Sequence, residues 1–266
     1  MGPGVLGGPR WPQDAGPRAA LRATVAPMAD TASLPALPAD PVTSIDEAVA
    51  VMASIAGALP ATDGLACFNR MYQVVTEKVG SEVTTGFYSD PAFMTALDVA
   101  FFNLYLDAVI GFGAVPPTAA LCWSELLADR TDPHIAPLQF ALAGMNAHIN
   151  HDLAIAVVRT CQDLGTAPDQ GTHAADFAKV NTVLGSLDQG IRESFEQGVL
   201  LDLDRRAAGL ENVVGNFSIG AAREVAWHDA QALWLLRHDA GLMRDYTEGL
   251  GAAAAVAGRA LLVPRL

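Results

Sequence analysis

The sequence has few basic residues for its length. Lysine and arginine together number 16 against 29 aspartates and glutamates, so the 266-residue chain carries a formal net charge of −13. A surface of this sign repels phosphate backbones and disfavours anionic membranes, because like charges repel. We therefore expect no nucleic-acid partner.

Cysteines are scarce as well. The three of them form no CxxC pair and each stands among apolar residues: Cys67, Cys122 and Cys161. This usage indicates buried free thiols in a reducing compartment. The N-terminal residues contain no apolar segment of the kind that a secretory signal requires. We therefore expect a cytoplasmic protein.

Long apolar runs are interrupted by acidic residues. The most apolar window, residues 97–115, contains the two carboxylates Asp98 and Asp107. A membrane-spanning segment rarely carries two carboxylates unless function demands them. We therefore expect no membrane span.

Common nucleotide and hydrolase motifs are missing. Outside the Gly- and Pro-rich residues 1–40, the sequence contains no GxGxxG, GxxxxGK[ST], GxSxG or HExxH motif, which argues against dinucleotide, P-loop, serine-hydrolase and zincin chemistry of the usual kinds. It also contains no DDxxD segment, which argues against an ordinary metal-dependent terpene cyclase.

Alanine and leucine are abundant, and no alternating strand pattern of any length occurs, so we predict an all-α fold. We expect a single compact domain of about eight or nine helices around a central buried helix at residues 137–163. Residues 1–40 are predicted to be a disordered leader, in which Met28 is a candidate start codon. Residues 41–248 would form the domain, and residues 249–266 an Ala-rich C-terminal helix or tail.

Several helix ends are marked in the sequence. Ser44 with Glu47 forms a capping box, Asp63 precedes a second apolar-periodic segment, and the Asp90-Pro91 pair precedes a third. Gly80 is predicted to end the second helix, as glycine often does. Residues 218–250 are predicted to form one long helical segment.

The central segment contains a dense polar stretch, GMNAHINHDLA, between the apolar runs PLQFALA and IAVV. On a helical wheel, Gln139, Asn146 and Asn150 share one face. Polar groups on a helix packed on all sides need partners inside the protein. This face therefore predicts either amide hydrogen bonds to neighbouring helices or, for Asn146 and Asn150, groups that hold a substrate oxygen.

The opposite face of the same segment carries His148 and Asp152 at i and i+4, with His151 at its edge. A histidine with a carboxylate at this spacing can be an oriented acid–base pair. The same residues can also be metal ligands, joined by His151 or by His228 from residues 222–234. The third alternative is a buried hydrogen-bonded pair without chemistry.

The order of these motifs resembles an actinobacterial family catalogued as domain-of-unknown-function family 5995. The matching pieces are FNRMYQVVTEKV (68–79), PLQFALAGMNAHINHDLAIAVV (137–158), DFAKVNTVL (176–184) and NFSIGAAREVAWHDAQALW (216–234). The resemblance implies a compact helical domain in a bacterial cytoplasm, and it implies no settled activity. A second, weaker likeness to zinc-dependent phospholipase C enzymes rests on the HxxxD spacing of His148 and Asp152 alone.

Three functions follow as hypotheses. The leading one is an enzyme that applies acid–base chemistry (isomerase, cyclase or hydrolase type) to a small apolar or amphipathic metabolite in a pocket between helices. His148, Asp152, Asn146 and Asn150 would carry that chemistry, and no cofactor would be required. One alternative is a metal-dependent hydrolase that binds a divalent metal through His148, Asp152, His151 and His228. The other is a non-enzymatic ligand-binding or scaffold protein.

Overall fold

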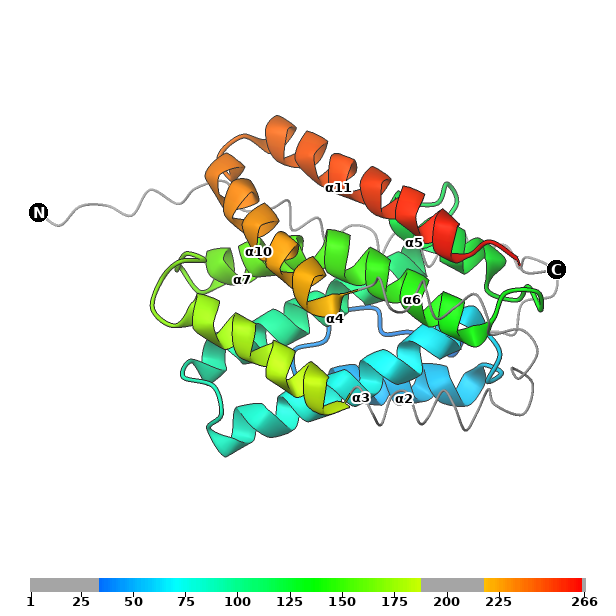
Figure 1. Cartoon of the computed structure of the whole chain (residues 1–266), viewed down its shortest axis with the longest axis horizontal. Coiled ribbons are helices and arrows are strands. Elements are labelled where there is room, and N and C mark those ends of the chain that lie inside the picture. Colours follow the sequence, from blue (N-terminus) through cyan, green and yellow to red (C-terminus); the bar gives the residue numbers. More distant parts are fainter. Residues whose placement is uncertain (1–33, 188–217, 265–266) are drawn as a thin grey trace, which may run out of the picture.

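The computed structural model describes residues 34–187 and 218–264 (Figure 1). Every regular element in these two ranges is helical, which confirms the predicted all-α class. The predicted leader lies almost wholly outside them. The element order begins with α2 (Ile45–Ala58), α3 (Gly64–Thr85), α4 (Pro91–Phe112) and α5 (Leu121–Asp129).

The predicted central helix is present with the expected limits. It consists of α6 (Pro137–Ala147), the π-helical turn η1 (His148–Asp152) and α7 (Leu153–Asp163). It is followed by the helical residues 173–187 and, after the undescribed stretch, by α10 (Ile219–Leu236) and α11 (Ala240–Leu261). In Figure 1 the segment α6–α7 runs through the middle of the bundle.

The helices on either side bury this central segment. At its N-terminal half, α6 packs against α3 and α11. At its C-terminal half, α7 packs against α4 and α10, and η1 contacts α10, α11 and α4. Two apolar clusters form the core, one around α2, α3, α5 and α6 and the other around α4, α7, residues 173–187 and α10. Both clusters include side chains of the central segment, so its polar groups must be satisfied within the protein.

The cap residues act as their chemistry predicts. Asp63 accepts hydrogen bonds from the backbone of Leu65 and Ala66 at the start of α3, and Asp90 accepts one from Phe93 at the start of α4. Ser44 caps α2. These side-chain acceptors satisfy amides that have no partner inside their helices.

Two predicted helix limits are wrong. Gly80 does not end α3, which continues to Thr85 and ends at Gly86 with φ of +77°. Gly80 faces Ile45 of α2, so packing against α2 keeps it helical. Residues 218–250 are not one helix, because Asp239 begins α11 by accepting from Gly241 and Leu242.

Two other features bear on the predicted organisation. The predicted boundary between residues 248 and 249 falls inside α11, whose C-terminal half packs on α5 and α6 (Figure 1). By length and composition alone, α4 could cross a membrane. Core helices of other proteins meet the same criteria, and half of the most apolar window of α4 (50%) is buried inside the protein. The three cysteines are free and buried, as predicted.

Candidate functional site

The polar stretch of the central helix is a π-helical turn. Residues His148–Asp152 form it, and the backbone N–H of Leu153 donates to the carbonyl of His148, five residues back. Such turns insert one extra residue into an α-helix and occur frequently at functional sites. Here both histidines of the turn, His148 and His151, contact one common partner.

That common partner is the carboxylate of Asp152. Its Oδ2 lies 2.8 Å from Nδ1 of His148 and its Oδ1 lies 2.6 Å from Nδ1 of His151. The indole Nε1 of Trp123, on α5, also donates to Oδ2 at 2.9 Å. Neighbours at i and i+1 in an α-helix do not face each other, yet within this π turn the His151 ring contacts the Asp152 carboxylate.

The protonation of this network follows from its contacts. Burial alone would raise the pKa of Asp152, but the hydrogen bonds from His148 and His151 outweigh it and lower the pKa to about 2. Burial lowers the pKa of His148 below its ordinary value, and the bond to Asp152 only partly opposes this. At neutral pH Asp152 is therefore ionised and His148 is neutral. Its proton lies on Nδ1, because an ionised carboxylate can only accept.

The ring of His148 is enclosed by aromatic side chains. Phe101 of α4 stacks on it with centroids 3.5 Å apart, and Tyr72 of α3 meets it edge-on at 4.6 Å. Three further rings stand within about 6.2 Å of the imidazole: Phe68, Tyr105 and Trp123. Nε2 of His148 is buried and has no hydrogen-bond partner among the described residues.

The amide face serves to hold α11. Asn146 donates to the carbonyl of Ala254 at 2.7 Å, and Asn150 donates to the side-chain oxygen of Asn146 at 3.0 Å. Gln139 donates to the carbonyls of Leu261 and Val263. Asn146 thus makes the predicted interhelical amide bond to α11, and Asn150 bonds to Asn146 within the same central segment.

The four predicted metal ligands are not all brought together. His148, His151 and Asp152 meet, but through hydrogen bonds from both Nδ1 atoms to the carboxylate. His228 is exposed on α10, where its Nδ1 contacts Gln231. Among residues 34–187 and 218–264, no group of three or more His, Cys, Asp and Glu side chains has the arrangement of a metal site.

A small cavity lies next to two of the aromatic rings that surround His148. It has a volume of about 50 Å³, and both Phe101 and Tyr72 line it. Its remaining lining is mostly aliphatic and includes two ionisable residues, Asp98 of α4 and Arg223 of α10. The aliphatic residues are Val75 and Val79 of α3, Met94 and Leu97 of α4, Leu153 of α7, and Val180. The same two rings therefore contact His148 and the cavity.

Asp98 is the unusual group of this cavity. It is 9% exposed, and its Oδ2 atom is buried without a hydrogen-bond partner in the part of the chain that the structure describes. Burial raises the pKa of its carboxyl to about 7. A carboxyl with such a pKa exists in both protonation states near neutral pH, which is a property of catalytic acids and bases.

Arg223 brings a positive charge to the cavity. Its Nε donates to Asn181 at 2.9 Å, one of its amino groups donates to the carbonyl of Phe177 at 2.8 Å, and its guanidinium stacks on the Phe177 ring. Burial lowers the pKa of Arg223 to about 10, which leaves it charged at neutral pH. No carboxylate among the described residues forms an ion pair with it, although it is only 6% exposed.

Sequence reasoning missed Asp98 and Arg223 as site residues. One signal for Asp98 was available, because it is one of two carboxylates in the most apolar window of the chain. Arg223 belongs to an ordinary amphipathic pattern, and only the packing of α10 against α7 and residues 173–187 reveals its burial. The structure places both in one cavity, which Tyr72 and Phe101 also line and His148 does not; both of these rings contact His148.

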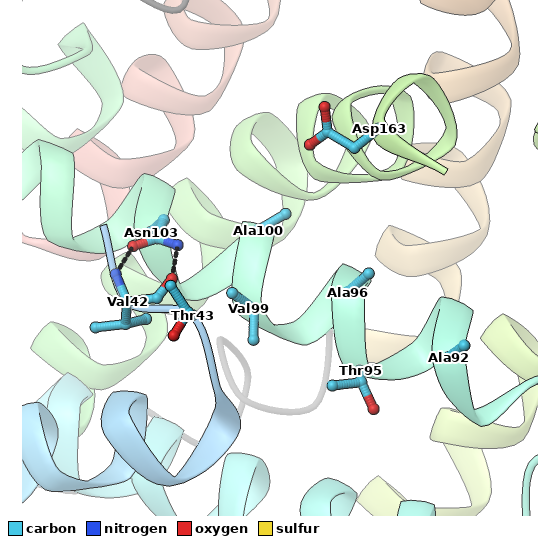
Figure 2. A pocket seen from close by; sticks show the side chains of 9 residues that line it. All are labelled: Val42, Thr43, Ala92, Thr95, Ala96, Val99, Ala100, Asn103 and Asp163. Atoms are coloured by element: carbon cyan, nitrogen blue, oxygen red, sulfur yellow. Dashed lines mark hydrogen bonds between the residues drawn. The ribbon is translucent and has the colours of Figure 1, made fainter. Parts of the chain in front are cut away.

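A second hollow lies along α4, near the residues that precede α2. Figure 2 shows its lining of small side chains from α4, with Asn103 bonded to the backbone of Val42 at 3.0 Å and Asp163 across the opening. Its volume is about 590 Å³. Asn103 is occupied in tethering residue 42, and Asp163 is the only charged group in the lining. The hollow thus lacks the convergent polar groups of a reaction site.

Comparison with known proteins supports the resemblance seen in the sequence. The model of the family of unknown function DUF5995 matches residues 45–264, which is most of the chain, so the chain belongs to this family. The comparisons found no match among curated proteins and none among solved structures.

Proposed function

We propose that this protein is a small-molecule enzyme that works by proton transfer, and that the Asp98 cavity is its reaction site. The observation that carries the proposal is the Oδ2 atom of Asp98, which is buried and unpartnered at the wall of a cavity. An unpaired buried carboxyl costs stability and serves no packing purpose. Such groups are found where chemistry requires them.

The proposed chemistry uses both protonation states of Asp98. In its ionised state the carboxylate takes a proton from a carbon or oxygen atom of the substrate, and the electron pair of the broken bond stays on the substrate. The same carboxyl then returns the proton to another atom of the substrate, which completes an isomerisation and restores Asp98. The charge of Arg223 stabilises the negative charge that develops in between.

His148 has a positioning role in this proposal. Because Tyr72 and Phe101 stand between its ring and the cavity, it acts through them and does not touch the substrate. Asp152 orients the imidazole of His148 by accepting a hydrogen bond from its Nδ1, and the indole of Trp123 on α5 donates a second hydrogen bond to the same carboxylate. The network thus holds in place the aromatic wall against which a substrate would lie.

Proton transfer can be tested without knowing the substrate. The protein is incubated in D₂O with pools of small metabolites, and deuterium incorporation is read by mass spectrometry. We expect at least one compound to gain deuterium with the wild-type chain and not with Asp98→Asn, which keeps the size of the side chain. A failure of every pool to exchange, or exchange that persists in Asp98→Asn, would refute the proposal.

The His148→Gln variant tests its role. A positioning residue leaves residual exchange with an unchanged pH profile, whereas a proton-transferring His148 would abolish exchange. The metal-hydrolase alternative stays a prediction that metal analysis of tag-free protein tests. It requires about one metal ion per chain that is lost on substitution of His148 or Asp152.

A further inference from the structure

We propose that the Asp98 cavity selects a small carboxylic acid, bound as its anion with the carboxylate at Arg223. The inference rests on the proposed function, since it names the substrate class of the same cavity. It is carried by three observations: a buried guanidinium at the cavity wall, the absence of a carboxylate partner for it among the described residues, and an otherwise aliphatic and aromatic lining.

Arg223 is held in a fixed orientation. The bonds from its Nε to Asn181 and from one amino group to Phe177, together with the stacking on the Phe177 ring, use one edge of the guanidinium. The other amino nitrogen, Nη1, donates no hydrogen bond to a described residue. An oriented guanidinium with free donors is the preferred protein group for binding a carboxylate.

The charge balance of the cavity favours an anion. Three ionisable residues line the cavity: Tyr72, Asp98 and Arg223. Burial raises the pKa of Asp98 to about 7, so its carboxyl is partly neutral at pH 7. Burial raises the pKa of Tyr72 well above its ordinary value, so this phenol is neutral as well. With Asp98 only partly ionised at pH 7, the charge of Arg223 exceeds that of Asp98, and an anion at Arg223 neutralises the excess.

The size of the cavity limits the ligand. One water-sized probe needs roughly 10–15 Å³, so a volume of about 50 Å³ accommodates a group of about three to five non-hydrogen atoms. Valine, leucine and methionine side chains line the same cavity as Arg223 and Asp98. A short aliphatic chain fits this lining, with the carboxylate at Arg223 and the reacting end of the molecule at Asp98.

The test compares an anion with a neutral amide of the same shape and with a cation of similar size. Propionate, propionamide and propylammonium are titrated into the ¹⁵N-labelled full chain, and binding is followed by the amide signals and by the Arg223 Nε–H signal. We expect propionate to bind at least about tenfold more tightly than the amide, since a hydrogen-bonded charge pair replaces a neutral contact. Equal binding of the amide, preferred binding of the amine, or no binding of any of the three would overturn the inference.

Three variants assign the binding to its residue. Arg223→Gln should lower the affinity for propionate at least about tenfold and remove the preference over propionamide, whereas Arg223→Lys keeps the charge and should keep part of the preference. If Arg223→Gln does not fold, the lysine variant and the ligand comparison in the wild-type chain still decide. Asp98→Asn should bind propionate and lack deuterium exchange.

The two proposals can therefore fail separately. Carboxylate binding without exchange in any metabolite pool would refute the enzymatic function and keep the anion site. Exchange on neutral compounds, with no preference for propionate over propionamide, would refute the anion site and keep the function.

Discussion

Asp98 should make the protein less stable as the pH rises from about 4 to about 7. Burial raises the pKa of this carboxyl from 3.8 to about 7 in the folded chain. Between these values the folded state binds a proton that the unfolded state has released, so the free energy of unfolding falls with increasing pH. At about 1.4 kcal/mol per pKa unit, the loss amounts to roughly 4 kcal/mol at pH 8.

The Asp98→Asn substitution should remove this loss, because the amide has nearly the same shape and does not ionise. We expect the variant to match the wild-type chain in stability near pH 4 and to exceed it by up to roughly 4 kcal/mol at pH 8. The assay is urea unfolding of both chains at a series of pH values. Subtracting the two curves cancels the other titrating groups, which the chains share.

The matched control is Asp245→Asn, which removes an exposed carboxylate from α11. This control separates the effect of burying the carboxylate from the effect of removing one negative charge from the protein. A stability difference between Asp98→Asn and wild type that does not change with pH would refute the reasoning, because Asp98 would then ionise equally in both states. A gain in stability on replacing a reactive residue is expected of functional sites, which are selected for activity over stability.

Three further substitutions test the packing around the site, each by denaturant unfolding. Trp123→Phe removes the donor to the ionised Asp152 and should cost about 1.5–3 kcal/mol, the usual loss for a hydrogen bond to a charged group. Asn146→Ala leaves the carbonyl of Ala254 without this donor and should cost about 1–3 kcal/mol. Gly144→Ala places a methyl group against the ring of Phe68 and should cost about 1–3 kcal/mol; Gly57→Ala, in open space on α2, is its control and should stabilise by about 1 kcal/mol.

The helices and most of their limits could be predicted because they depend on local chemistry. Asp63 and Asp90 cap the helices that follow them through their own side chains. The limits that sequence reasoning misplaced depend on packing instead. Gly80 lies inside α3, in contact with Ile45 of α2. The start of α11 is the exception, because Asp239 caps it through its own side chain and the signal was local.

The site could be predicted only in part, for a similar reason. The spacing of His148 and Asp152 predicts their contact, and the structure shows it at 2.8 Å. The contact of His151 with the same carboxylate lies within the π turn, which the helical wheel does not predict. The third donor to the carboxylate, the Trp123 indole, comes from α5 and follows only from the tertiary packing.

Asp98 and Arg223 show what the local pattern cannot supply. Arg223 has an ordinary place on its helix and Asp98 is marked only by its apolar surroundings, so they form one site only when α4 and α10 enclose the same cavity. Leaving a buried guanidinium and a buried carboxyl in one cavity without pairing them costs free energy. An ion pair between them would recover part of that cost, so a cavity that keeps them apart is better explained by a third group that binds both. A small carboxylic acid, with its anion at Arg223 and its reacting atom at Asp98, is such a group.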